Sequence, residues 1–160
     1  SSTNNVQSML FWLMGDLSQS RVNLAHYLLL IVGLAGGLLL SRSLNVLIRG
    51  ELLAVSLGVN VQALRLLLFF SASVFTATAV TIAGSVGFVG LIIPHMLRLL
   101  GARDHRLLIP SCILLGGSFL VIADSLARTI VAPQQLPVGV VTAVIGVPAF
   151  ILILRSTIRK

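Results

Sequence analysis

Charged residues are scarce in this sequence. Only 9% of its 160 residues are Asp, Glu, Lys or Arg, and 57% are hydrophobic, whereas about a quarter of the residues of a soluble domain are charged. This composition excludes an ordinary soluble domain and predicts an integral membrane protein. The net charge of +7 is dispersed among apolar runs without an aromatic and basic patch, so it does not indicate a nucleic-acid partner.

Lysine is almost absent, because Lys160 is the only one. A phosphate-binding loop of the Gly-x-x-x-x-Gly-Lys type needs a lysine beside its last glycine, so this chain does not bind ATP by that route. The four acidic residues do not pair with a serine or histidine in an arrangement typical of hydrolases. We therefore expect a protein that is not an enzyme, has no catalytic residues and binds no cofactor itself.

Cysteine and metal-ligand patterns are missing as well. Cys112 is the single cysteine, which excludes an internal disulfide bond, and its apolar neighbours indicate a packing role. His95 and His105 are ten residues apart and have no further ligand at metal-binding spacing. No metal site is predicted.

Long apolar runs dominate what the sequence does contain. Residues 22–40 would span about 28 Å as a helix, close to the thickness of a bilayer core. Residues 64–100 are too many for one crossing and suffice for two if the chain reverses near residues 84–87. Residues 107–123 and 138–154 are each just long enough to cross. The predicted fold class is all-α, a polytopic transmembrane helical bundle with about five crossings.

The positive charges give an independent prediction of topology, because cytoplasmic loops hold an excess of lysine and arginine. One set of faces carries, in three groups, Arg42, Arg49 and Arg65, then Arg98, Arg103 and Arg106, and finally Arg155, Arg159 and Lys160. The opposite faces carry only Arg21 and Arg128. Five crossings with an outside N-terminus and a cytoplasmic C-terminus reproduce this alternation.

Residues 1–21 precede the first crossing and are predicted to lie on the outer face. Their apolar part is too short to cross, and Trp12 with Tyr27 suits an interfacial belt. The same part is alternatively the end of a crossing that starts further upstream. Because the sequence begins with Ser1 rather than Met, we expect a piece of a longer chain.

Residues 41–63 form an amphipathic segment between two apolar runs. Leucines and valines alternate there with polar residues, so a helix would present an apolar face outside the membrane spans. Glu51 falls in the first turn of this helix, and Gly58 is a natural C-terminal stop. Two interpretations remain open, an interfacial helix that rests on lipid and a docking surface for a cytoplasmic partner.

Three glycines at intervals of three residues, Gly84, Gly87 and Gly90, precede Pro94. A proline frees the carbonyl group four residues before it, here that of Gly90, so the helix is predisposed to bend. A bend suits a gate or hinge, and close packing through small residues is the alternative. Further small-residue pairs, interpreted as packing seams, are Gly33 with Gly37 and Gly139 with Ala143.

Asp124 and Arg128 stand four residues apart at the outer end of the fourth crossing. They can pair along one helix face, so a local ion pair is one interpretation. Ionisable residues near membrane depth are energetically costly and often functional, so a functional role is the other.

Five motifs cover nearly the whole chain in order. They are Arg49-Gly50-Glu51 through Ala54 to Leu57-Gly58-Val59, then residues 87–98, then Asp104-His105-Arg106, then residues 123–128, and finally Leu136-Pro137-Val138-Gly139 through Gly146-Val147-Pro148. With these motifs the chain resembles the permease subunit of bacterial ABC importers for iron chelates (siderophores), haem and vitamin B12.

In that family the permease has about ten crossings and works as a dimer on two ATPase subunits, and an external (periplasmic) substrate-binding protein delivers the substrate. The resemblance implies that residues 1–160 are the C-terminal half of such a permease, a multi-pass protein of the bacterial cytoplasmic (inner) membrane. It places Arg128 opposite a glutamate of the binding protein. It assigns ATPase coupling to the loop 41–63, with the candidate residues Arg49, Gly50, Glu51, Leu53, Ala54, Leu57 and Gly58.

We therefore expect a permease subunit of an ATP-driven importer for an iron-siderophore-type metal chelate, with ATP used by the partner subunit. The helices that carry Gly84 to Pro94 would re-pack to switch access. A secondary transporter or channel is an alternative, but it would predict intramembrane acids, and only Asp124 comes near that position. A non-transporting membrane scaffold is the other alternative, and it would need no amphipathic cytoplasmic loop.

Overall fold

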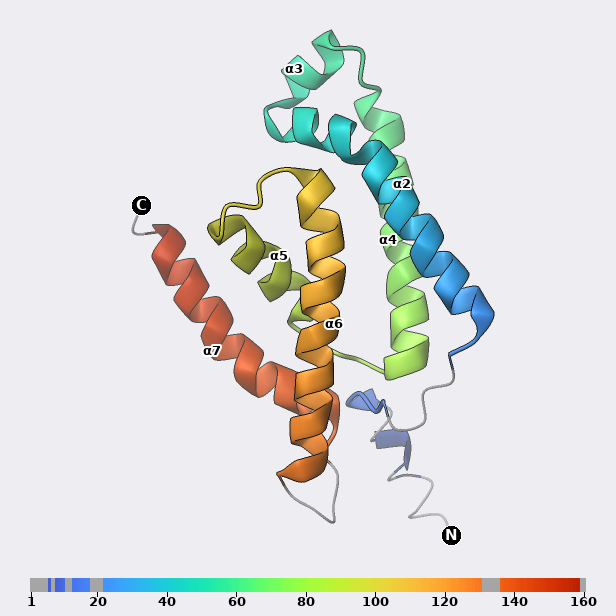
Figure 1. Ribbon diagram of the computed structural model, residues 1–160, viewed down its shortest axis with the longest axis vertical. Helices are drawn as coiled ribbons and strands as arrows, with labels where there is room; N and C mark the ends of the chain where they lie inside the picture. Colours follow the sequence, from blue (N-terminus) through green and yellow to red (C-terminus); the bar gives the residue numbers. More distant parts are fainter. Residues whose placement is uncertain (1–5, 7, 11–12, 18–21, 131–135, 159–160) are drawn as a thin grey trace.

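Helices account for the regular secondary structure in the described part of the chain. The computed structural model describes residues 6, 8–10, 13–17, 22–130 and 136–158. Its main helices are α2 (Leu24–Ile48), α3 (Glu51–Ser56), α4 (Val61–Ala83), α5 (Val89–Leu99), α6 (His105–Thr129) and α7 (Val138–Ile158) (Figure 1). Arg21, Arg159, Lys160 and Trp12, which carried part of the topology prediction, lie outside the described residues.

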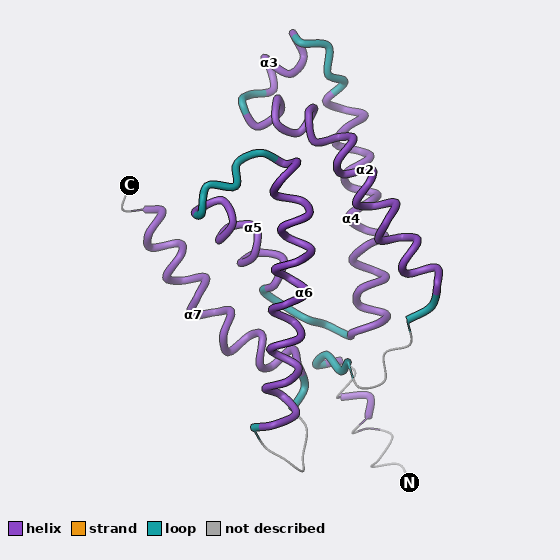
Figure 2. Tube along the Cα trace, viewed as in Figure 1, coloured by secondary structure: helices purple, strands orange, loops and turns teal. Residues whose placement is uncertain are grey.

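The chain runs back and forth along the long axis of the molecule (Figure 2). Helix α2 leads to α3 at one end, here called the α3 end, and α4 returns from it (Figure 1). Helix α6 starts toward the α3 end and runs to the opposite end, here called the Arg128 end, and α7 ends level with the start of α6. Most of the arginines predicted to be cytoplasmic therefore lie toward one end.

Four of these helices are long and apolar enough to cross a membrane, namely α2, α4, α6 and residues Val138–Arg155 of α7. In the place of the remaining crossing the structure has α5, whose 11 residues extend about 16 Å, half the thickness of a bilayer core. Helix α4 ends at Gly84, with φ of 70°, and α5 begins only after Phe88. The fold class is a polytopic all-α membrane protein, and the short α5 is its departure from five full crossings.

Local side chains set several helix boundaries. The Oδ1 of Asn60 accepts a hydrogen bond from the backbone N–H of Ala63 at the start of α4, and Asp104 caps α6 through the N–H of Arg106. Both are N-caps that satisfy otherwise unpaired amides. The last turns of α2 change direction (Figure 1). In the second half of this helix, the fully buried Ser41 donates to the carbonyl oxygen of Leu38. Serine bonds of this kind bend helices.

The buried core lies where α5, α6 and α7 meet. Its centre is a cluster of Ala123, Ala127, Val138 and Val141, each at most 8% exposed. A Cβ atom added to Gly146 of α7 would lie only 2.6 Å from Cβ of Phe88, so the absence of a side chain at Gly146 allows the segment before α5 to pack closely on α7. Small residues thus bring these helices together, as in other membrane bundles.

Helix α2 packs through the two glycines predicted as a seam. A Cβ atom at Gly33 would lie 2.1 Å from the ring of Phe75 on α4, and one at Gly37 would lie 3.2 Å from the side chain of Ile109 on α6. The packing interpretation of this pair is confirmed, with one glycine serving each neighbouring helix.

Candidate functional site

Helix α3 projects beyond the spanning helices at the α3 end of the molecule (Figure 1). Gly50 precedes it with φ of 133°, and Gly58 follows it with φ of 81°, conformations that side chains with a Cβ rarely adopt. The N–H of Gly58 bonds to the carbonyl of Val55, and that of Val59 to the carbonyl of Ala54. This pair of bonds is a Schellman motif, so α3 ends where the sequence predicts.

The two faces of α3 differ in exposure. Ala54 is completely buried against the rest of the protein, whereas Leu52 is 89%, Val55 58% and Leu57 62% exposed. Leu53 is partly covered at 43%. The helix therefore presents a cluster of uncovered apolar side chains at the tip of the molecule, which is the arrangement of a docking surface or of a lipid contact.

Helix α3 is tied to α4 as well as to the glycine turns. A guanidinium nitrogen of Arg65 lies 2.6 Å from Oε2 of Glu51, and Arg49 forms the C-cap of α2 directly before Gly50. The seven candidate coupling residues consequently form one continuous turn between α2 and α4.

A polar contact that the sequence analysis missed joins α2 to α6 beside this turn. The Nδ2 of Asn45 donates to Oδ1 of Asp104 at 2.7 Å, and the N–H of His105 donates to Oδ1 of Asn45 at 2.9 Å. Hydrogen bonds from the backbone of Arg106 and from Asn45 lower the pKa of the Asp104 carboxyl below its usual value. An Asp before an apolar run signals a helix N-cap, but its partner 59 residues away has no local signal.

The candidate gate residues lie along the segment that links α4 to α5 and within α5. Gly84 and Phe88 have φ of 70° and 68°, so the backbone turns sharply at both ends of this link. A Cβ atom on Gly87 or Gly90 would meet nothing within 4 Å, and Pro94 lies inside α5. Within the described chain, these two glycines therefore do not pack closely against a neighbour. The interpretation of this segment as a gate or hinge stays a prediction.

The link is held between the N-terminal segment and the start of α7. The hydroxyl of Ser85 donates to the carbonyl oxygen of Leu13, and the N–H of Val138 donates to the carbonyl of Gly15 at 2.9 Å. A Cβ atom at Gly139 would lie 2.1 Å from the carbonyl oxygen of Met14 and 2.8 Å from that of Ser85. Three chain segments thus meet backbone to backbone at this point.

Arg128 is close to the opposite end of α6 from the candidate coupling loop. Its Nε donates to Oδ2 of Asp124 at 2.8 Å, and the two side chains are 40% and 26% exposed. The local ion pair predicted from their spacing is therefore present. This bond uses one of the five N–H donors of the guanidinium group, so the pair does not exclude a contact with a partner.

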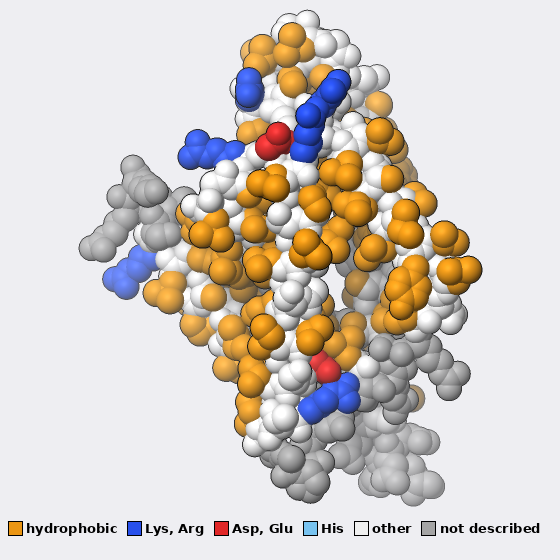
Figure 3. Space-filling view, viewed as in Figure 1, with side chains coloured by type: hydrophobic (Ala, Val, Ile, Leu, Met, Phe, Trp, Pro, Cys, Tyr) orange, Lys and Arg blue, Asp and Glu red, His pale blue; other side chains and the backbone are white. Residues whose placement is uncertain are grey.

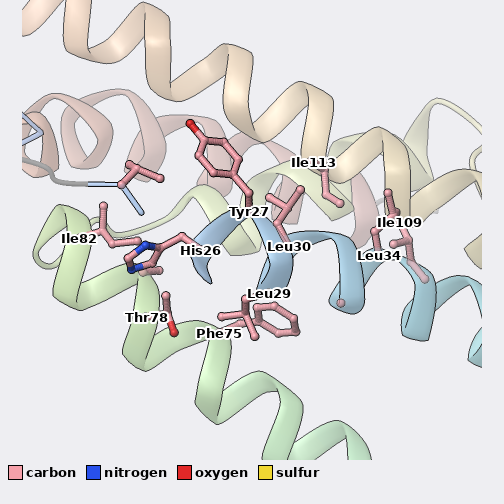
Figure 4. Close-up of a pocket in the computed structure, with 13 residues that line it drawn as sticks. His26, Tyr27, Leu29, Leu30, Leu34, Phe75, Thr78, Ile82, Ile109 and Ile113 are labelled. Atoms are coloured by element: carbon pink, nitrogen blue, oxygen red, sulfur yellow. The ribbon is translucent and has the colours of Figure 1, made fainter. Parts of the chain in front are cut away.

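One side opening of the membrane region lies between α2, α4 and α6. This cavity of about 470 Å³ is lined mainly by apolar side chains, with His26, Tyr27 and Thr78 as polar exceptions (Figure 4). Nδ1 of His26 accepts a hydrogen bond from the N–H of Asn23, so this histidine caps α2. Across the described ranges, no three His, Cys, Asp or Glu residues gather in a way that could hold a metal ion.

Comparison with known proteins shows a consistent set of relatives. The chain is 45% identical over 157 residues to a cobalamin import system permease protein of Halobacterium salinarum, and the match covers 97% of this chain and 42% of that protein. It is 44% identical over 156 residues to an ABC transporter permease protein of Bacillus subtilis (94% and 43% covered). It is 40% identical over 164 residues to a vitamin B12 import system permease protein of Escherichia coli (99% and 49% covered).

A solved structure agrees with these relatives. It is described as a metal-chelate type ABC transporter in an inward-facing conformation, and it matches with a TM-score of 0.84 and 32% sequence identity over 98% of this chain and 51% of its own. The chain spans about half the length of the proteins that it matches. The sequence profile of the FecCD transport family covers residues 1–156, and the chain therefore belongs to the FecCD transport family.

Proposed function

We propose that this chain is the C-terminal half of a transmembrane permease subunit of an ATP-driven importer, which passes a chelated metal inward from an external binding protein. Membership of the FecCD transport family supports this proposal, as do the names of its relatives, which are import permeases. The chain itself has no phosphate-binding loop, so ATP hydrolysis is assigned to a partner ATPase.

The substrate class is a metal chelate. An iron-siderophore complex is the expectation from sequence resemblance, while the names of two relatives point to cobalamin, a cobalt chelate. Cobalamin is therefore the first substrate to test, with an iron-siderophore complex second. Uptake of labelled cobalamin and of ⁵⁵Fe-siderophore by cells that depend on the complete permease separates the two, because each label reports one chelate.

The exposed apolar face of α3 is the observation that carries the proposed coupling to ATP hydrolysis. Leu52, Val55 and Leu57 are each more than half exposed outside the spanning helices. A partner ATPase that presses on α3 would cover this face, and its movement would reach the spanning helices through α2 and α4. The link with Gly84, Gly87, Gly90 and Pro94 is the proposed place where the bundle re-packs to switch access.

Charge substitution on α3 tests the coupling. In the complete permease, we expect Leu52→Asp and Leu53→Asp to weaken co-purification of the ATPase or to uncouple hydrolysis from uptake, because a carboxylate is forced into an apolar contact. Leu100→Asp is the matched control, since Leu100 is 78% exposed in the turn after α5. Normal uptake and normal ATPase association in both α3 variants would mean that α3 only rests on lipid.

The proposed orientation has the α3 end in the cytoplasm. With Cys112 replaced by Ser, we expect Ser56→Cys to react with an impermeant thiol reagent only from the cytoplasmic side and Thr129→Cys only from outside. Both positions are exposed and described, one on α3 and one at the end of α6. Labelling of Ser56→Cys in intact cells would show that the α3 end lies outside the cell, which contradicts the proposed orientation.

Arg128 is proposed to contact an acidic residue of the external binding protein. The guanidinium keeps further donors beyond its bond to Asp124, and charge pairs across an interface favour specificity and a fast on-rate. We expect Arg128→Glu to weaken capture of the binding protein, with partial rescue when the facing glutamate of that protein is changed to arginine. If Asp124→Asn is equally harmful and no partner change rescues either variant, the pair serves only the local helix.

A further inference from the structure

A small cavity with two arginines opens at the α3 end of the bundle. It has a volume of about 440 Å³ and is lined by Leu38, Leu39, Arg42 and Arg106, which come from the end of α2 and the start of α6. Arginine side chains gather around this end of the molecule on the face shown in Figure 3. The cavity therefore combines an apolar wall with two cationic groups.

The two guanidinium groups form no ion pair with the described carboxylates. The ion pairs found there join Arg65 to Glu51 and Arg128 to Asp124. Asp104 interacts electrostatically with Arg106, and its Oδ1 accepts hydrogen bonds from Asn45 and from the backbone N–H of Arg106. One carboxylate beside two arginines leaves one positive charge uncompensated. The cavity consequently keeps an excess of positive charge.

The parts of α2 and α6 that carry the two exposed arginines are joined by hydrogen bonds beside the cavity. Asn45, one helical turn beyond Arg42, bonds to Asp104 and to the backbone of His105, and Arg106 is the next residue. This contact fixes the end of α2 against the start of α6. A site that exists before its ligand arrives loses less free energy to ordering on binding.

The depth of the cavity matches the level of lipid headgroups. Arg42 lies about 27 Å along α2 from its first residue, Leu24, and Arg106 lies about the same distance along α6 from Asp124. A bilayer core is about 30 Å thick. Arg42 thus sits about one core thickness from the first residue of α2, and Arg106 about one core thickness from Asp124, the next charged residue along α6. Leu38 and Leu39 lie on the side of the core.

We propose that this cavity binds an anionic phospholipid, with the phosphate between Arg42 and Arg106 and an acyl chain along Leu38 and Leu39. Guanidinium groups bind phosphate oxygens with paired, charge-assisted hydrogen bonds. Basic pockets between transmembrane helices are typical sites for acidic headgroups. The bound lipid would brace the junction of α2 and α6 beside the candidate coupling turn, and this role is independent of which substrate the permease carries.

Lipid titration of the complete permease, purified with its ATPase, tests the site. Native mass spectrometry would measure the dissociation constant of dioleoyl phosphatidylglycerol, with dioleoyl phosphatidylcholine as the zwitterionic comparison and soluble glycerol phosphate as the free-phosphate competitor. Arg42→Gln and Arg106→Gln should each weaken phosphatidylglycerol binding about fivefold, and the double variant about 25-fold. Arg103→Gln is the matched control, because Arg103 is exposed at the same end but does not line the cavity.

Lysine at both positions keeps the charge but not the paired guanidinium bonds, so this variant should bind phosphatidylglycerol more tightly than the double glutamine variant, which separates loss of the site from misfolding. Unchanged lipid binding in the double glutamine variant would overturn the proposal, as would an equal loss in Arg103→Gln. Displacement of the lipid by glycerol phosphate at similar concentration would show a phosphate site instead. Loss of the ATPase with lipid binding retained would show that the arginines face a protein partner, which also overturns it.

Discussion

Helices α4 and α7 are both apolar membrane spans, yet they differ in how much of their surface the rest of the chain buries. None of the spanning window of α4 is buried within the protein, compared with 22% of that of α7. The corresponding values are 6% for α2 and 17% for α6. The chain thus consists of a group that packs on itself, α5 to α7, and a pair, α2 and α4, that joins this group mainly where α2 meets α6 and leaves most of its apolar surface uncovered by this chain.

Close packing of small side chains accompanies the burial in the α5 to α7 group. Lipid tails are as apolar as leucine, so helices in a bilayer associate by close packing rather than by burying hydrophobic area. Where α6 meets α7, Ala123 and Ala127 face Val138 and Val141. On α4, Phe69 and Phe70 are instead 67% and 64% exposed, and their rings contact each other edge to face.

Gly139→Ala should give the largest effect, because it acts inside the packed group. The added Cβ would lie 2.1 Å from a backbone oxygen of Met14, and backbone cannot move aside as a flexible side chain can. We expect a loss of about 3 kcal/mol or more in stability, seen as a lower melting temperature of the purified permease. Gly36→Ala on α2 is the matched control, since its Cβ would meet nothing within 4 Å.

Equal loss in both glycine variants would contradict the contrast between the two groups. It would mean that Gly36 is in contact with a part of the assembly outside this chain and that α2 is as tightly packed as α7. The comparison between the variants therefore tests whether exposure within this chain reports packing in the complete permease.

Asn45→Ala acts on the contact between the two groups. It removes the bonds to Asp104 and His105, and because water can reach the exposed Asp104 that is left behind, we expect only a modest loss of stability. The melting temperature should fall by less than in Gly139→Ala. Ser73→Ala is the control, because the hydroxyl of Ser73 bonds to the carbonyl of Phe69 in its own helix. An equal fall in melting temperature in that variant would show that the bonds between Asn45 and α6 have no special role.

The sequence predicted the elements better than their contacts. Apolar length located the spans, and Gly58 and Gly84 marked real helix ends because their backbone conformations are set locally. The ion pair of Asp124 with Arg128 followed from their spacing on one helix. The bond between Asn45 and Asp104 did not, since it depends on how α2 packs against α6, and the residues near Asn45 and Asp104 in the sequence do not specify that packing.

The length of helix α5 could not be predicted from the sequence either. The 37-residue apolar run gave enough length for two crossings, but the extended link before Phe88 and the turn after Leu99 leave only 11 helical residues. Apolar length alone does not distinguish helix from extended chain that is covered by neighbouring segments. The cavity with Arg42 and Arg106 could not be predicted from the sequence either, because its lining comes from two helices that are far apart in the sequence.

Gly58→Ala should have a moderate effect that is confined to the α2 and α4 pair. Its φ of 81° is unfavourable for a residue with a Cβ by about 1 kcal/mol, so the Schellman end of α3 loosens. We expect faster proteolysis in the 49–60 loop and little change in melting temperature. Gly117→Ala in α6 is the control, with φ in the helical range and open space around its Cβ; faster cleavage of the loop in that variant would rule out a local cause.

Glu51→Gln should have the smallest effect, although its ion pair with Arg65 is short at 2.6 Å. The two side chains are 53% and 60% exposed, and exposed ion pairs contribute less than about 1 kcal/mol because water and salt screen them. We expect a change in melting temperature within error and the same ATPase association as the unchanged protein. A double-mutant cycle with Arg65→Gln measures the coupling directly. A coupling energy above about 2 kcal/mol between Glu51 and Arg65 would mean that the pair is shielded from water in the complete assembly. That result would be evidence for a partner over α3, independent of the evidence from the leucine variants.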